Sequence, residues 1–575
     1  MEFGLVAVVA VVILVGTSIL GGRIGVAAPL LLVVVGIGLG YLPFVPLVEI
    51  DPEIILLVVL PPLLYAAAVN VPLVDFRRNF RPVVGLSVVL VVLSAVVIGF
   101  ITHLLVPALP LPAAIALGAV ISPTDAVAAT SIGKRLGMPE RVVSILEGES
   151  LVNDATSLVL LKTAVAAVSG SFVFWNAAGS FAFSVTVAVI VGALVGFATV
   201  WIRSHLQNPV YDTMISFVVP FIAFIPVEEV GASGVLAVVV TGLYTGHHAS
   251  RRFSASARMN ERLNWRTVQF VLENGVFLVM GLQLHALVEQ VGESPFRLGH
   301  VGLLSLALVV LLILCRTGFV APLVLVMRNL ARRTEAKSNG FSRVAERFRQ
   351  KSDVDTRKLR KVELLEQRTR ADFEHERDQQ LGWRDGAVLS WSGMRGVVTL
   401  AAAQSIPVSV PYRAQIVLVA FTVAVLTLLL HGLTLPPLIR KLWPGGTATG
   451  DRVGELTSLT GDLYEAANNA IDDAVAADEG KRNALSEQTI ARARASARNS
   501  LAPIALALPA TGPIDVQSSE TPAQAYLRLA RIALEAQRTA LLEERAIGRY
   551  SSSALRTAEL ALDAHETRLH PPSKH

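Results

Sequence analysis

The chain has 575 residues, of which 53% are hydrophobic and only 17% are charged, and its formal net charge is +5. This composition excludes an ordinary soluble protein, and the single cysteine, Cys315, excludes an internal disulfide and a cysteine-rich metal site. The positive charge is typical of the basic cytoplasmic loops of membrane proteins, so we expect a lipid bilayer and no nucleic acid as the partner.

Thirteen apolar segments are expected to cross the membrane. Each should be a helix, because hydrocarbon offers no water to backbone groups, and a span of about 20 residues crosses roughly 30 Å. The segments lie near residues 4–20, 28–47, 52–69, 83–104, 112–133, 142–168, 177–203, 209–226, 232–248, 267–289, 300–328, 385–406 and 413–438. The sequence therefore predicts an all-α, multi-pass protein of the cell (inner) membrane, with twelve spans as the alternative count.

The connections between these segments alternate in charge. One set is rich in arginine, as in residues 77–81 and 251–266, whereas the other set carries few charges or acids such as Glu228 and Glu229. The positive-inside rule then places the N-terminus outside and the C-terminus in the cytoplasm.

Two regions are expected to lie in the cytoplasm. Residues 329–384 form a charged loop within a transmembrane domain at 1–442, and this loop has a helical pattern at 358–366. Residues 450–575 form a tail of several short helices with a linker near 509–513. Charge-rich helices are most often solvated faces, and a regulatory or partner-binding role is the alternative. Neither region has a recognisable catalytic motif, so we expect neither an enzyme nor a cofactor.

The fifth segment carries an acid just after a proline. Pro123 removes a backbone donor and frees carbonyl groups, while Thr124 and Asp125 place a hydroxyl and a carboxylate at that break. Transporters use such mid-membrane breaks to offer backbone oxygens to a cation. A simple kink with Asp125 capping the broken end is the alternative.

The sixth segment adds a second group of polar residues. Ser150 and Asp154 are four residues apart and share a helix face, so both can offer oxygens to a hard cation such as Na⁺. Asn153 can hydrogen-bond into the broken helix without adding charge. A purely structural polar network is the alternative.

The twelfth segment contains Arg395 between two glycines, which permits a second interrupted helix and so indicates inverted repeats. An unpaired buried charge is very costly, and Glu149 is the expected partner of Arg395. Arg316 and Glu273 are secondary candidates, paired with each other or with the acids of the ion site.

These motifs, taken in order, resemble the sodium–proton exchanger family in its bacterial NhaP-type branch. The matching strings lie at residues 60–64, 122–125, 148–154, 231–237 and 393–396. The resemblance implies a homodimer in which two crossed, interrupted helices move against a fixed unit. Members often carry an acid about four residues past the proline pair, where this chain has Tyr65 and Ala66, so one possible ligand is missing.

The resemblance also implies a role for each site residue. Asp154 would bind Na⁺ or H⁺, and Asn153 would mark the one-for-one, electroneutral branch. The other Na⁺ ligands would be Thr124, Asp125 and Ser150, and Glu149 with Arg395 would form a structural ion pair. We therefore expect electroneutral exchange of Na⁺ or Li⁺ for H⁺ in pH and sodium homeostasis. K⁺/H⁺ exchange is the main alternative, followed by a cation channel and a non-transporting membrane sensor.

Overall fold

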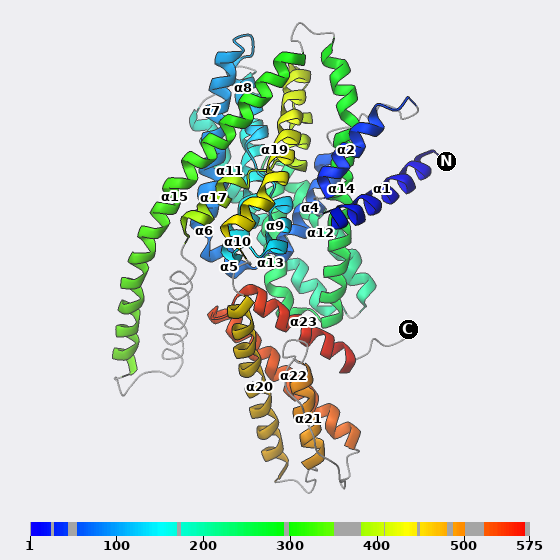
Figure 1. The fold of residues 1–575 in the computed structure, drawn as a ribbon. Helices are drawn as coiled ribbons and strands as arrows, with labels where there is room; N and C mark the ends of the chain where they lie inside the picture. The colour runs from blue at the N-terminus through cyan, green and yellow to red at the C-terminus, as the bar shows by residue number, and fades with distance from the viewer. Residues whose placement is uncertain are drawn as a thin grey trace. The chain divides into compact units, whose positions relative to one another are not determined.

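The computed structural model describes residues 2–24, 28–43, 54–168, 174–206, 208–292, 298–349, 381–407, 409–444, 449–479, 487–500 and 522–569. These residues form helices and their connections, with no strand among them, so the all-α prediction is confirmed (Figure 1). The chain divides into two compact units. Unit 1 comprises Met1–Ala249, Glu261–Asn329 and Leu381–Thr447, and unit 2 comprises Ser250–Asn260, Leu330–Gln380 and Ala448–His575.

Helices occupy every apolar segment that the sequence picks out. In chain order they are α1 Glu2–Ile24, α2 Ala28–Gly40, η1 Ile55–Val59 with α4 Leu60–Asn70, α5 Leu73–Arg78, α6 Phe80–Val84 with η2 Gly85–Val89 and α7 Leu90–Leu105, α8 Leu111–Ile121 with α9 Ala126–Leu136, α10 Glu140–Val168, α11 Phe174–His205, α12 Pro209–Glu229, α13 Gly234–Arg252, α14 Ala255–Gly292, α15 Leu298–Arg349, α17 Trp383–Trp391 with α18 Val397–Gln404, and α19 Arg413–Leu442. Among the described residues, seven helices are long and apolar enough to cross a membrane. The number of crossings stays a prediction.

Two boundaries differ from the expected ones. Helix α15 continues to Arg349, so the region expected to be a loop from 329 onward begins as a helix. Helix α14 already begins at Ala255, well before the apolar stretch at 267. Both extensions are rich in charged residues. Hydropathy alone therefore does not predict them, because it detects only the apolar part of a helix. Residues 350–380 and the linker near 509–513 lie outside the described residues.

Small residues let the membrane helices approach closely. Gly281 of α14 lies against α2, where an added Cβ would stand 2.4 Å from the carbonyl oxygen of Val33 and 2.7 Å from the Cα of Gly36. Helices in lipid associate largely through such close backbone packing, because lipid tails are as apolar as the side chains. The contact between α2 and α14 therefore depends on glycine at this point.

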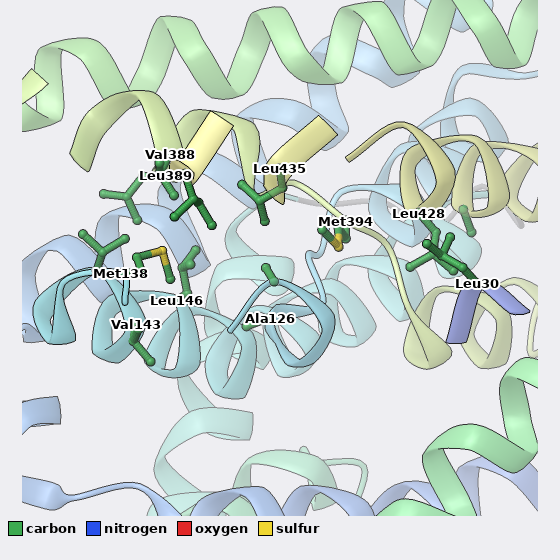
Figure 2. Close-up of a cluster of buried hydrophobic side chains, with 14 of the residues drawn as sticks. Leu30, Ala126, Met138, Val143, Leu146, Val388, Leu389, Met394, Leu428 and Leu435 are labelled. Atoms are coloured by element: carbon green, nitrogen blue, oxygen red, sulfur yellow. The ribbon is translucent and has the colours of Figure 1, made fainter. Parts of the chain in front are cut away.

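The largest buried cluster surrounds the break between α17 and α18. Met394 lies in that break and is fully buried among apolar side chains from several helices (Figure 2). Its neighbours in the cluster include Leu30, Ala126, Met138, Leu146, Leu389 and Leu428. A non-helical link inside a membrane is tolerated only where protein encloses it, and this cluster supplies that enclosure.

The tail in unit 2 contains four described helices, α20 Thr449–Glu479, α21 Glu487–Ser500, α22 Pro522–Ile547 and α23 Ser552–Leu569. They pack through leucine and alanine side chains such as Leu463, Leu529 and Leu562. Of these helices α20 has 31 residues and α22 has 26, so the expectation of short helices is wrong for both. In an amphipathic helix with a narrow apolar side, the many charged residues make the length of the helix hard to predict from the sequence.

Replacing Gly281 by alanine should destabilise the protein, because the new methyl group meets backbone atoms that cannot rotate away. Overpacking of this kind costs about 1–3 kcal/mol, which lowers the Tm in detergent. The matched control is Gly302→Ala in α15, where nothing lies within 4 Å of the added Cβ. An equal Tm for the two variants would contradict the close contact.

Candidate functional site

Two interrupted helices meet at their breaks. Helix α8 ends at Ile121 and α9 begins at Ala126, while α17 ends at Trp391 and α18 begins at Val397. The amide of Asp125 in the first break donates to the carbonyl of Met394 in the second, at 2.8 Å. The structure thus brings together the two breaks predicted from Pro123 and from the glycines beside Arg395.

Arg395 compensates the carbonyl ends of two helices. Its Nε donates to the carbonyl of Ile121 at 2.9 Å and its Nη2 to that of Ser122 at 3.4 Å, both at the end of α8. Its Nη1 donates to the carbonyl of Gly393, just past α17. Helix C-termini carry partial negative charge, and a buried guanidinium with five donors suits two of them at once.

Asp125 lies at the amide ends of the other two half-helices. It directly precedes α9, and a Cβ added to Gly396, the residue before α18, would stand 1.9 Å from its Oδ2. The carboxylate therefore reaches the start of α18 only because residue 396 is glycine. Helix N-termini attract negative charge, so Asp125 compensates the amide ends as Arg395 compensates the carbonyl ends.

Helix α10 holds the first break in place. Asn153 donates through Nδ2 to the carbonyl of Thr124 at 2.9 Å and to its hydroxyl at 3.1 Å. The hydroxyl of Ser150 accepts from the amide of Ala126 at 3.4 Å, and the hydroxyl of Ser157 donates to the carbonyl of Ala119 at 2.8 Å. Backbone groups that the break leaves without helical partners are thus bound by side chains of α10.

The expected ion pair of Glu149 with Arg395 is wrong, because Glu149 pairs with Arg316 of α15. Arg316 Nη1 and Nη2 lie 2.5 Å and 2.8 Å from the two carboxylate oxygens, and Arg316 Nε donates to the carbonyl of Leu389 at 2.7 Å. Thr124 adds a donor to Glu149 at 2.6 Å. Bidentate geometry favours Arg316, whereas the Arg395 guanidinium donates to backbone carbonyls.

Asp154 is buried on α10, at 7% exposure, and Asn153 beside it is fully buried. Within the described part of the chain, no hydrogen bond or ion pair to Asp154 is found, and Asn153 Oδ1 has no hydrogen-bond partner. Asp154 directly follows Asn153, which binds Thr124 in the first break. Buried oxygens of this kind are costly to leave unbound, so they mark a place for a bound cation or proton.

Glu273 of α14 is a second buried acid. Arg316 forms its ion pair with Glu149, so the alternative pairing of Arg316 with Glu273 is not observed. Ala66 on α4 is fully buried, at the position where the resemblance leads one to expect an acid.

Sequence reasoning missed one buried charge cluster. Arg203 of α11 binds both oxygens of Asp212 of α12, at 2.7 Å and 2.9 Å, and Glu261 of α14 at 2.6 Å. Arg203 lies at the end of an apolar segment, where an arginine is typical of a cytoplasmic connection. The acids in positions 212 and 261 were the available signal, since each lies close to the expected end of an apolar segment.

Comparisons with known proteins identify the family of this chain. The sodium/hydrogen exchanger family, described as transmembrane, matches residues 8–441. The chain belongs to this family. Members are cation/proton antiporters, so the chain is a multi-pass membrane transporter that exchanges cations for protons.

The chain is also similar to individual proteins. An uncharacterised Na⁺/H⁺ exchanger of Mycobacterium tuberculosis is 31% identical over 448 residues, covering 76% of this chain and 74% of the relative. A sodium, potassium, lithium and rubidium/H⁺ antiporter of Bacillus pumilus is 28% identical, covering 72% and 58%. The solved sodium proton antiporter MjNhaP1 of Methanocaldococcus jannaschii shares the fold, with a TM-score of 0.56 at 17% identity, covering 77% of this chain and 99% of its own.

A double-mutant cycle should separate the observed ion pair of this exchanger from the one expected at first. Glu149→Gln and Arg316→Gln should each lower the Tm strongly, because removing one partner of a buried pair costs about 3–5 kcal/mol. The double variant should lose much less than the sum, with a coupling energy above about 1 kcal/mol. The control cycle of Glu149→Gln with Arg395→Gln should show smaller coupling, and the opposite ranking would overturn the assignment.

Proposed function

We propose that the protein exchanges one Na⁺, or Li⁺, for one H⁺ at the carboxylate of Asp154. The observation that carries this proposal is the state of the buried charges around it. Glu149 is paired with Arg316, Asp125 lies at helix N-termini, and Arg395 binds helix carbonyls. Asp154 and Glu273 remain as buried acids that no described cationic side chain compensates, and Asp154 is the one that follows Asn153 beside the break between α8 and α9. Asp154 therefore needs either a proton or a metal cation.

Charge balance supports a one-for-one exchange. On α10 beside the break, Asp154 is the carboxylate without a described cationic partner, and its neighbour Asn153 is neutral, so H⁺ and Na⁺ each cancel a single negative charge. Each loaded form is then neutral, and neutral forms cross a low-dielectric barrier at the least electrostatic cost. Electroneutral exchange follows from this balance.

The oxygens of Ser150, Thr124 and Asp125 are the proposed further ligands of the transported Na⁺. All three lie at or beside the break between α8 and α9, and Na⁺ is a hard cation that prefers oxygen. The Thr124 hydroxyl donates to Glu149 and accepts from Asn153, which leaves one lone pair of its oxygen for a cation. Ser150 shares the face of α10 that carries Asp154.

The proposal also covers the oligomeric state, the membrane and the orientation of the transporter. We propose that it acts as a homodimer in the cell (inner) membrane, with the N-terminus outside and the C-terminus in the cytoplasm, in pH and sodium homeostasis. The alternation of basic and acidic connections supports the orientation. The two interrupted helices at the site support alternating access, in which the loaded half-helices move against the remaining helices.

The variant Asp154→Asn should abolish Na⁺-driven proton movement in proteoliposomes that contain a pH-sensitive dye, because asparagine cannot exchange a proton. The matched control is Glu140→Gln, an exposed acid in the first turn of the same helix, which should keep the wild-type rate. Clamping the membrane potential should leave the wild-type rate unchanged. Normal exchange by a folded Asp154→Asn variant would end the proposal.

Competition for one carboxylate predicts a specific pH dependence. Where Asp154 is mostly protonated, the apparent KM for Na⁺ should rise about tenfold for each unit by which pH falls, because one proton must leave for each Na⁺ that binds. The measurement is the initial rate against Na⁺ concentration at several symmetric pH values. An apparent KM that does not change with pH would rule out a shared site.

K⁺/H⁺ exchange is the second candidate, favoured by the relative that is named an antiporter of sodium, potassium, lithium and rubidium. Ala66 also favours it, because the site lacks one acid that would tighten the shell around a small cation. Adding Na⁺, Li⁺ or K⁺ in turn to the same proteoliposomes separates these cases. Unitary conductance without proton coupling would indicate a channel, and the absence of any flux would indicate a sensor.

A further inference from the structure

The helices of unit 1 form two groups. The site group consists of α8, α9, α17, α18 and α19, because α19 packs against each of the four half-helices. The flanking group consists of α4, α11, α12, α13 and α14. Gly242 and Gly246 of α13 lie against α4, and Gly192 of α11 lies against α13. Arg203 ties α11 to α12 and α14 through Asp212 and Glu261.

The tail is connected to both groups, but by different means. It follows the site group in the chain, since α19 ends at Leu442 and α20 begins at Thr449. Ser250–Asn260 belongs to the same compact unit as the tail, and this segment ends α13 and begins α14 in the flanking group. Unit 2 therefore includes a piece of the flanking group that α20–α23 hold by contact.

Four of the residues in that contact, Ser250, Arg258, Glu559 and Asp563, are called the latch below, and Arg545 of α22 also donates to Ser250. Arg258 Nε donates to Asp563 at 3.3 Å, and Arg258 Nη2 forms a second hydrogen bond with the other oxygen of that carboxylate. Arg258 Nε also lies 3.9 Å from Glu559, and the hydroxyl of Ser250 donates to Glu559 at 2.5 Å. The side chain of Arg258 is 4% exposed and that of Asp563 is fully buried, so the latch is shielded from solvent and salt.

When the latch opens, its acids and its arginine each keep other hydrogen-bond or ion-pair partners. Asp563 retains Arg538 of α22 at 2.9 Å, and Glu559 retains Arg545 of α22 at 3.6 Å. Arg258 retains its bond to the carbonyl of Phe253. Because each acid is already paired within the tail, opening the latch leaves fewer uncompensated charges than the rupture of an isolated buried pair. The acids at 559 and 563 are also four residues apart, so α23 presents them on one face.

We propose that the tail is a strap that joins the site group to the flanking group through the latch and slows the exchange cycle. This inference rests on the proposed alternating access, in which the site group moves against the rest. An element fixed covalently to α19 and by the latch to the start of α14 resists that movement. Releasing the latch frees the movement and raises the turnover rate, while the ion site itself is unchanged.

The test compares the initial exchange rates of full-length variants in proteoliposomes. Arg258→Ala and Asp563→Asn should each raise the maximal rate several-fold and leave the apparent KM for the cation unchanged. The matched control, Arg252→Ala, removes an exposed arginine from the same segment and should keep the wild-type rate. Unchanged or lower maximal rates in both latch variants, with wild-type Tm, would overturn the strap.

A cross-link tests the same idea by closing the contact covalently. In a Cys315→Ser background, Ser250→Cys with Glu559→Cys is bridged by a short bismaleimide. Bridged protein should exchange more slowly than the same protein before bridging, and an equal rate would overturn the strap.

Hydrogen–deuterium exchange separates a failed strap from a failed function. Latch variants should show faster amide exchange in residues 255–260 and in α23, whether or not any cation moves. Faster amide exchange with an unaltered transport rate overturns the strap alone. A wild-type protein that moves no protons on addition of any cation overturns the proposed function, and the inference with it.

Discussion

The structure depends on the compensation of four helix ends inside the membrane. Each interrupted helix exposes carbonyls on one side of its break and amides on the other, where no water can bind them. Arg395 takes the carbonyl ends of α8 and α17, and Asp125 lies at the amide ends of α9 and α18. The hydrogen bond from Asp125 to Met394 joins the two breaks, so neither compensating charge can be placed without the other.

This arrangement explains why the buried charges divide into structural and functional ones. A charge that compensates a helix end or another side chain is neutralised locally and gains little from a further ion. Glu149 with Arg316 and Arg395 with the carbonyls are of this kind. Asp154 differs, because it lies beside the same break without a described cationic partner. The proposed ion site is thus the carboxylate beside the break that no described cationic side chain compensates.

The sequence predicted the breaks and the site helix, but not every pairing. Pro123 and the glycines beside Arg395 are local signals, and local backbone chemistry is readable from neighbouring residues. The partner of Glu149 is not local, because Arg316 lies 167 positions away and its contact depends on how α15 turns toward α10. The latch is even harder to predict, because Arg258 pairs with an acid 305 positions later in the chain. That acid lies on an amphipathic helix whose charges the sequence suggests are simply exposed to solvent.

The geometry of α10 shows how one helix can both hold the break in place and carry the proposed ion-binding acid. Residues four apart share a face, whereas Glu149 and Asp154 are five apart and so lie about 140° from each other around the axis. Glu149 and Asn153 form one face, and both bind Thr124, which fixes the break. Ser150 and Asp154 form the next face, where Ser150 contacts the start of α9. Glu149, which holds the break, and Asp154, the proposed ion-exchanging residue, are therefore separated by helical periodicity. In the proposed cycle Asp154 can then change its charge without disturbing the pair at Glu149.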